Sequence, residues 1–174
     1  IVVHPKIPLD HLLYLFEKSG SVPRVDEQFV SLAKDEERFL EIVGQWFLNR
    51  LKGVLARGLV KDYRPLEEPL KSPKGRILVG GTISSWYKGR FSFDCSYEEF
   101  DEDNPLNRVL AGACRAIVGA RGVFSGETRK EAKRLLFEFP PMSPFILEDL
   151  RCGTDRRTSY YGESLTLARH ILSG

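Results

Sequence analysis

The tripeptide Glu131-Ala132-Lys133 is the part of the sequence that comes nearest to a catalytic motif. Metal-dependent nucleases bind Mg²⁺ with an Asp and an (Asp/Glu)-x-Lys pair, in which carboxylates hold the ion and the lysine positions the attacking water. The pair works on a strand, because alternate residues of a helix diverge by about 200°. The apolar spacing around residue 131 predicts a helix, so we expect Glu131 and Lys133 on a solvated helix face. A stand-alone Mg²⁺-dependent nuclease is therefore the least favoured function.

The sequence lacks the motifs of nucleotide-binding enzymes and of nucleophile-based hydrolases. It contains no Gly-x4-Gly-Lys-Ser/Thr phosphate loop and no Gly-x-Ser-x-Gly nucleophile elbow, and Gly80-Gly81 does not open a predicted helix. The acidic run Asp101–Asp103 lacks the glycine and the terminal glutamate of a calcium loop, and is better explained as the lead into a helix N-terminus. We expect no catalytic residue and no cofactor in this chain.

The cysteines and histidines are too far apart to predict a metal site. None of them has the Cys-x-x-Cys or His-x₃-His spacing of a zinc ligand set. An odd number of isolated cysteines is typical of reduced thiols, which predicts a cytoplasmic protein. Apolar runs are interrupted by charges before about 18 residues, so no transmembrane helix is expected. The residues concerned are Cys95, Cys114, Cys152, His4, His11 and His170.

Basic residues gather around the predicted strands, at Arg57, Lys61, Arg64, Lys71, Lys74, Arg76, Lys88 and Arg90. One interpretation is that these charges protect exposed sheet edges. The other is a cationic finger that reaches into a partner protein and stabilises phosphate charge or orders acidic loops. Trp86 and Tyr87, in a predicted turn, suit an interface because aromatic side chains bury much area at low entropy cost. They could equally pack on their own hairpin.

The charge of the whole chain is close to balance. Its 174 residues include 26 Lys or Arg and 24 Asp or Glu, a formal net charge of +2. Domains that bind nucleic acid as their main function usually have a stronger basic bias. A DNA-binding module is therefore a second alternative, and any DNA contact is expected to be local or indirect.

The periodicity of apolar residues predicts helices that flank a small sheet. Alternation of Phe91, Phe93, Cys95 and Tyr97 with polar residues is typical of a half-buried antiparallel strand. Prolines 65, 69 and 73 argue against a continuous helix or central strand between the first two strands. Helices are predicted at about 9–16, 35–56, 104–117, 125–137 and from 158, and strands at 59–63, 76–83 and 90–97.

These elements predict an α+β fold, a helical scaffold with an inserted antiparallel β-meander or partial barrel. The expected parts are an N-terminal helical part (1–56), a β finger insert (57–98) and a C-terminal helical part (99–174), together one compact unit. Because the last helical pattern runs to the final residues, we expect the native chain to continue.

Five short motifs occur in a fixed order along the chain. Arg57-Gly58-Leu59 with Asp62-Tyr63, then Lys74-Gly75-Arg76-Ile77, then Phe93-Asp94 with Asn107-Arg108, surround the predicted strands. Pro5-Lys6-Ile7-Pro8 precedes the first helix, and Tyr160-Tyr161 precedes the last. In this order and spacing the motifs resemble the McrC family, a subunit of the 5-methylcytosine-specific restriction enzyme. The resemblance extends over nearly the whole chain.

The resemblance implies a partner and a role. McrC proteins pair with McrB, a hexameric AAA+ motor that hydrolyses GTP; their front part projects a β-rich finger into the ring and stimulates hydrolysis, and a separate PD-(D/E)xK domain cuts DNA. The chain would then be the non-catalytic front part of a modification-dependent restriction endonuclease. GTP and Mg²⁺ would belong to the partner, and further Mg²⁺ to the missing nuclease domain. DNA would be contacted mainly through the complex.

The resemblance and the residue types together give the candidate site residues. Gly75 is expected to be structural and to let Arg76 approach a partner closely. Asn107 and Arg108 are also expected to be structural, tying the start of their helix back to the β insert. The candidates for partner binding are Arg57, Lys61, Lys74, Arg76, Trp86, Tyr87 and Arg90.

Overall fold

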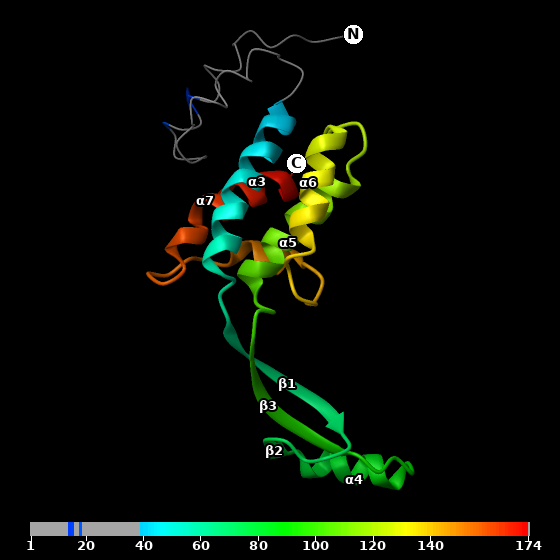
Figure 1. Cartoon of the computed structure of the whole chain (residues 1–174). Helices are drawn as coiled ribbons and strands as arrows, with labels where there is room; N and C mark the ends of the chain where they lie inside the picture. The colour runs from blue at the N-terminus through cyan, green and yellow to red at the C-terminus, as the bar shows by residue number, and fades with distance from the viewer. Residues whose placement is uncertain (1–13, 16–17, 19–38, 174) are drawn as a thin grey trace. The chain divides into compact units, whose positions relative to one another are not determined.

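The described part of the chain forms two units, one helical and one built around a small sheet. The computed structural model describes residues 14, 15, 18 and 39–173. Residues 39–59 and 105–173 belong to the helical unit, and Val60–Asn104 form the β unit (Figure 1). Tyr14 and Leu15 are helical, and the rest of the predicted helix at 9–16 lies outside the described residues, as does the Pro5–Pro8 motif.

The helical unit contains the helices that the apolar spacing predicts. Ser125 forms the expected N-cap, because its hydroxyl accepts a 3.2 Å hydrogen bond from the Thr128 amide. Helix α5 packs against α6 and α7, and α3 packs against α6 and α7. The elements are α3 (Phe39–Arg57), α5 (Pro105–Gly119), α6 (Gly126–Leu136), the 3₁₀ turns η1 (Leu147–Arg151) and η2 (Ser159–Tyr161), and α7 (Gly162–Ser173).

The core of the helical unit lies where α3, α5 and α7 meet. Trp46 and Phe47 are 0% exposed, and removing a buried side chain of this size costs about 3–5 kcal/mol. Val43, Leu51 and Val54 are also buried, so these residues form the inward face of α3, whereas Leu40 is 41% exposed. The large buried side chains from the other helices are Leu110, Ile117, Leu135, Tyr161, Leu165 and Leu167.

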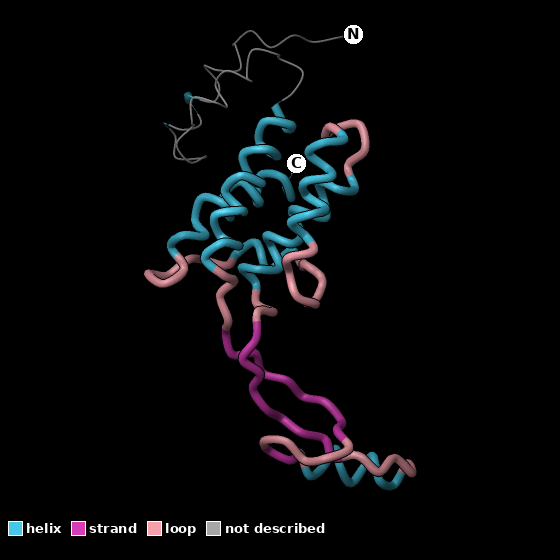
Figure 2. The backbone as a smooth tube through the Cα atoms, viewed as in Figure 1, coloured by secondary structure: helices cyan, strands magenta, loops and turns pink. Residues whose placement is uncertain are grey.

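The β unit is a three-stranded antiparallel sheet with one helix (Figure 2). Its strands are β1 (Asp62–Leu70), β2 (Arg76–Ile77) and β3 (Phe93–Asp101), and its helix is α4 (Val79–Tyr87). The strand order is β1-β3-β2, so β3 is central and both neighbours run antiparallel to it. The connectivity therefore differs from the predicted meander, in which consecutive strands would be neighbours. The side-chain amide of Asn104 donates a 2.8 Å hydrogen bond to the Val60 carbonyl and joins the two ends of the unit.

Two predictions within the β unit are wrong, each for a physical reason. Strand β1 extends through Pro65 and Pro69, which an edge strand tolerates because the missing N–H groups can face away from the sheet. The strand predicted at 76–83 ends at Ile77, and Val79–Tyr87 is helical, so Gly80-Gly81 lie in the first turn of α4 and Trp86-Tyr87 at its end, not in a strand and a turn.

The architecture is α+β, as the sequence predicts: a mainly helical chain with a small antiparallel sheet. Among the described residues, no helix has both the length and the apolar character needed to cross a bilayer.

Candidate partner-binding surface

Helix α4 is fixed to β3 by hydrogen bonds at its first turn. The Leu78 amide donates to the Asp94 carbonyl at 2.7 Å, and the Asp94 amide donates to the Thr82 hydroxyl at 3.0 Å. A Cβ at position 81 would overlap the Asp94 carboxylate, so Gly81 allows this close approach. Because Thr82 is buried at 6% exposure, the face of α4 that carries it is the one turned toward the sheet.

Beside this face, α4 exposes a row of apolar side chains. Val79, Ile83, Trp86 and Tyr87 are 64%, 47%, 46% and 90% exposed and occur at i, i+4, i+7 and i+8, which places them on one side of a helix. Ile83, Trp86 and Tyr87 line a shallow hollow of about 440 Å³. An exposed apolar row of this kind is typical of a surface that binds another protein. We call these four residues the α4 apolar row.

Trp86 is held in place although half of it is exposed. Its indole N–H donates a 2.9 Å hydrogen bond to the Ser92 carbonyl, and its ring meets Phe93 edge-on, with centroids 5.7 Å apart and an interplanar angle of 75°. Phe91 beside it is 85% exposed. A pre-ordered aromatic side chain loses little entropy on binding, so Trp86 is suited to be an anchor.

Two of the four basic candidates in the β unit are paired with acidic side chains of the same unit. Lys61 forms an ion pair with Glu102 at 3.2 Å, and Lys74 with Glu99 at 3.8 Å. The Lys74 ammonium also lies 3.8 Å from the centre of the Tyr97 ring. These contacts neutralise the two lysines locally, so their charge is only partly available to a partner.

Arg76 and Arg90 are the more available charges of the β unit. Arg76 is exposed on β2, and no ion pair of its guanidinium is found among the residues that the structure describes. Arg90 is exposed and lines a hollow of about 410 Å³ together with Glu67, Glu68 and Asp94. These three carboxylates could form charge-assisted hydrogen bonds with a basic side chain of a partner as well as with Arg90.

The β unit is not cationic overall within its structural bounds, although the predicted finger at 57–98, with eight Lys or Arg and five Asp or Glu, has a formal net charge of +3. Residues 60–104 contain seven Lys or Arg and nine Asp or Glu, a formal net charge of −2. The carboxylates on and after β3 offset the basic residues: the Arg64 guanidinium lies 3.0 Å from Asp101 and 3.5 Å from Asp103. These ion pairs raise the pKa of Arg64, chiefly through its hydrogen bond to Asp101.

Gly75 has a backbone that only glycine adopts readily. Its φ is +67°, and a Cβ there would lie 2.6 Å from the Ser96 carbonyl oxygen and 2.7 Å from the Tyr97 Cβ. The close approach of the 74–76 segment to β3 depends on it.

Asn107 and Arg108 form hydrogen bonds inside the helical unit. The Asn107 side-chain oxygen accepts a 2.7 Å bond from the Tyr161 hydroxyl, and Arg108 binds both carboxylate oxygens of Asp149, at 3.0 and 2.8 Å. These bonds join α5 to η2 and η1. The expected tie from the two residues to the β insert stays a prediction.

Arg57 belongs to the helical unit and is separate from the other candidates. It ends α3, and its guanidinium lies 5.5 Å from the centre of the Tyr160 ring.

Glu131 and Lys133 lie on helix α6. The nuclease alternative requires them on a strand. Glu131 forms ion pairs with Arg134 and Lys52, both at 2.8 Å, and these two contacts, Arg134 first, lower the pKa of Glu131 to about 2. No group of three or more His, Cys, Asp or Glu side chains that could share a metal ion is found within residues 14, 15, 18 and 39–173.

The α4 apolar row is the feature that the sequence interpretation missed. The i, i+4, i+7, i+8 spacing from Val79 to Tyr87 was the available signal. Gly80-Gly81 and the β-branched Thr82 and Ile83 concealed it, because these residues are weak helix formers.

Comparison with known proteins identifies a family and a fold. The family model described as McrBC 5-methylcytosine restriction system component matches residues 1–174. A curated relative, the type IV methyl-directed restriction enzyme EcoKMcrBC of Escherichia coli (strain K12), is 26% identical over 175 residues. The match covers 97% of this chain and 49% of the relative, so the chain spans about half of that protein's length.

Two structures have a similar fold. A chain of the Thermococcus gammatolerans McrBC complex, determined by cryo-EM, matches with a TM-score of 0.62 at 19% identity, covering 93% of this chain and 50% of that chain. A chain of the half-complex from the tetradecameric assembly of T. gammatolerans McrB AAA+ hexamers with bound McrC gives a TM-score of 0.62 at 20% identity, covering 93% and 40%.

Proposed function

The chain belongs to the McrBC 5-methylcytosine restriction system component family, and from this membership we propose that it is the non-catalytic, McrC-like part of a modification-dependent restriction endonuclease. In this proposal it binds and stimulates an McrB-like hexameric AAA+ GTPase and couples GTP hydrolysis to DNA cleavage. GTP and Mg²⁺ are bound by the partner, and the DNA-cutting site lies in another part of the parent protein. The similarity in fold to chains from McrBC assemblies supports the proposal.

The observation that carries the proposal is the α4 apolar row. Four apolar side chains on one side of a nine-residue helix are 46–90% exposed, and two of them are a tryptophan and a tyrosine. Interface hot spots are enriched in these two residue types, and helices commonly bind partners through apolar residues at such spacing. In the proposed complex the row packs against apolar side chains of the AAA+ subunits.

The basic candidates have a second role in the same surface. Arg76 and Arg90 are exposed in the β unit. Lys74, two residues before Arg76, lies over the Tyr97 ring. Arginine forms two-point hydrogen bonds with carboxylates and phosphates, so these side chains are proposed to order acidic loops of the GTPase around the apolar contact. Because Lys74 and Lys61 are already paired, we expect Arg76 to contribute most.

The proposal is tested by measuring GTP turnover of the McrB-like partner against increasing concentrations of this chain. Tyr87→Ser removes an exposed ring without disturbing the core, and should raise the concentration needed for half-maximal stimulation about tenfold, the effect of a hot-spot residue. Phe137→Ser, at a residue 79% exposed in the helical unit, is the matched control and should change nothing. Arg76→Glu with Lys74→Glu should also weaken stimulation. Unchanged stimulation by Tyr87→Ser and by the charge reversals would exclude this surface.

A further inference from the structure

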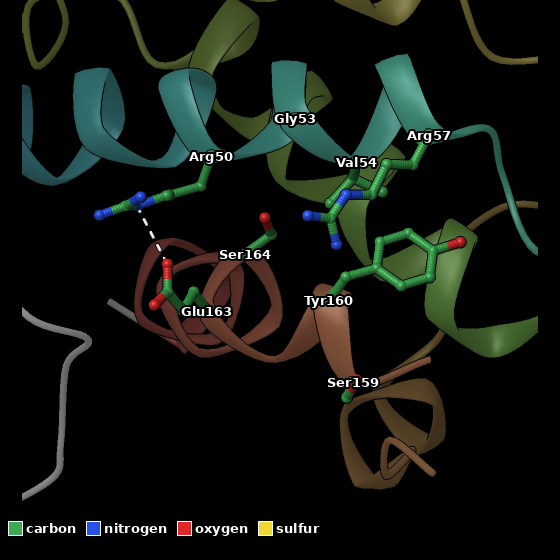
Figure 3. A pocket seen from close by; sticks show the side chains of 8 residues that line it. All are labelled: Arg50, Gly53, Val54, Arg57, Ser159, Tyr160, Glu163 and Ser164. Carbon is green, nitrogen blue, oxygen red and sulfur yellow. Dashed lines mark ion pairs between the residues drawn. The ribbon is translucent and has the colours of Figure 1, made fainter. Parts of the chain in front are cut away.

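We propose that a pocket between α3 and the η2–α7 segment binds a phosphate of a nucleic-acid backbone. The pocket has a volume of about 320 Å³ and is lined by Arg50, Gly53, Val54, Arg57, Ser159, Tyr160, Glu163 and Ser164 (Figure 3). All of these residues belong to the helical unit. This site is distinct from the α4 apolar row, and its function does not depend on the AAA+ partner.

Among the described residues that line the pocket, there are two arginines and one carboxylate. Arg50 forms a 3.1 Å ion pair with Glu163, whose side chain is 52% exposed. Arg57 has no carboxylate within ion-pair distance among the described residues, and its guanidinium lies over the Tyr160 ring. A cation–π contact occupies the face of a guanidinium but leaves the N–H groups at its edge available to a ligand. The charge therefore suits a single anion.

The position of Arg57 is fixed by its neighbours. The Tyr160 hydroxyl donates a 3.1 Å hydrogen bond to the Gly58 carbonyl at the end of α3, so the ring beneath Arg57 is held to the same helix end. Figure 3 shows the Arg57 guanidinium and the Ser164 hydroxyl directed toward the space between the two segments. Gly53 contributes no side chain, and a Cβ there would touch nothing within 4 Å, so the α3 side stays open. A pre-ordered guanidinium with nearby hydroxyls is suited to bind phosphate oxygens.

The distribution of charge favours nucleic acid over an acidic protein segment. The helical unit, residues 1–59 and 105–174, contains nineteen Lys or Arg and fifteen Asp or Glu, a formal net charge of +4, against −2 in the β unit. Arg156 and Arg157 are exposed and directly precede the Ser159–Tyr160 side of the pocket. A nucleic-acid backbone has one negative charge per nucleotide, so several separated cations of a protein can each contact a different phosphate. A single carboxylate of a protein segment would occupy only one of these cations.

The test measures binding of a short, unmodified, fluorescent DNA duplex to the 174-residue chain across a salt series, without the AAA+ partner. Arg57→Ala should lower the affinity at least several-fold and reduce the slope of log affinity against log salt by about one contact. Arg121→Ala is the control: it removes the same charge from the same unit but lies beside Phe124, whose ring contacts Gly44 near the other end of α3. Glu163→Gln, which removes the one carboxylate among the described lining residues, should raise the affinity.

Three results would overturn the proposal: no DNA binding at low salt, equal losses in Arg57→Ala and Arg121→Ala, or unchanged affinity in Glu163→Gln. A poly-glutamate peptide that competes as well as DNA, with the same dependence on Arg57, would assign the pocket to an acidic protein segment instead. Thermal unfolding of each variant checks that the helical unit remains folded. Because the partner is absent, loss of GTPase stimulation by Tyr87→Ser and loss of DNA binding by Arg57→Ala are separate outcomes.

Discussion

Arg108 and Asp149 form a two-point ion pair inside the helical unit. The Arg108 Nε and Nη2 atoms donate to the two carboxylate oxygens of Asp149 at 3.0 and 2.8 Å, and the side chains are only 14% and 3% exposed. Asp149 also accepts a 3.1 Å bond from the Ile146 amide, so the pair fixes η1 against α5.

Breaking this pair should destabilise the helical unit strongly. Arg108→Leu leaves the Asp149 carboxylate buried without its main partner, and should lower the free energy of unfolding by about 3–5 kcal/mol. Arg134→Leu, at a pair whose arginine is 61% exposed, should cost less than about 1 kcal/mol. Urea unfolding followed by circular dichroism measures both. Equal losses in the two variants would contradict the structural role of Arg108.

Replacing Gly75 by alanine should destabilise the β unit more than the same replacement at Gly89. Gly75→Ala places a Cβ at φ +67° against the Ser96 carbonyl, and should cost about 1–3 kcal/mol or displace the 74–76 segment. Gly89→Ala has a similar φ of +73° but no atom within 4 Å of the added Cβ. The difference in stability between the two variants therefore isolates the close contact with β3. A difference near zero would show that the segment moves freely.

The carboxylate of Glu41 should make stability depend on pH. Burial raises its pKa, but hydrogen bonds from Thr128 (2.6 Å), the Ser125 amide (2.8 Å) and Gln45 (2.9 Å) outweigh burial and leave the pKa lowered from 4.5. A lowered folded-state pKa contributes stability above the unfolded value, and this stability is lost as the pH falls below 4.5 toward the folded value.

The expected result is a flatter pH profile in Glu41→Gln. The variant should be less stable than the parent chain at neutral pH, and the gap between them should narrow as the pH falls below 4.5. Glu131→Gln is a useful comparison, because Glu131 has its pKa lowered to about 2 by exposed arginine and lysine partners and its effect should be screened by salt. A gap that stays constant down to acid pH would contradict the role assigned to Glu41.

The cysteines should react in a fixed order. Burial raises the pKa of Cys114 to about 12 and also raises the pKa of the half-buried Cys152. Because the thiolate is the reactive form, Cys114 should resist alkylation at neutral pH until its unit unfolds. Cys152, near the surface, should react first. Alkylation followed by mass spectrometry measures the order, and early labelling of Cys114 in native buffer would contradict the packing of α5.

The sequence predicted the elements whose local signals agree with their surroundings. Helices α3, α5, α6 and α7 have apolar stripes at helical spacing, and Ser125 is a good N-cap, so local preference and tertiary packing favour the same structure. Helix α4 was missed because Gly80-Gly81 and Thr82 disfavour a helix locally. It is held by two hydrogen bonds to the Asp94 backbone, whose carbonyl accepts from the Leu78 amide and whose amide donates to the Thr82 hydroxyl; Asp94 lies beyond the helix in sequence.

The sequence supplied candidate residues for partner binding but not the physical environment of those residues. Trp86 and Tyr87 are exposed, but on a helix. The cationic finger was inferred from lysines and arginines alone; the carboxylates that oppose them, such as Glu99 and Asp101, come from β3. Cross-strand pairing depends on register, and the register could not be read while β1 was assigned to end before its prolines.

The prolines of β1 have a consequence for recognition by the β unit. Pro65 and Pro69 direct their nitrogens to the same side as Tyr63, whose N–H is already bonded to Asp62 at 2.9 Å. Between the two prolines, only the backbone N–H of Glu67 is directed outward. The strand at the other edge of the sheet, β2, is two residues long. An extended peptide that needs a continuous ladder to add as a new strand would find none, which also protects against association through sheet edges. Binding of a partner strand by main-chain hydrogen bonds is therefore disfavoured, and the side chains of the β unit determine which partner it binds.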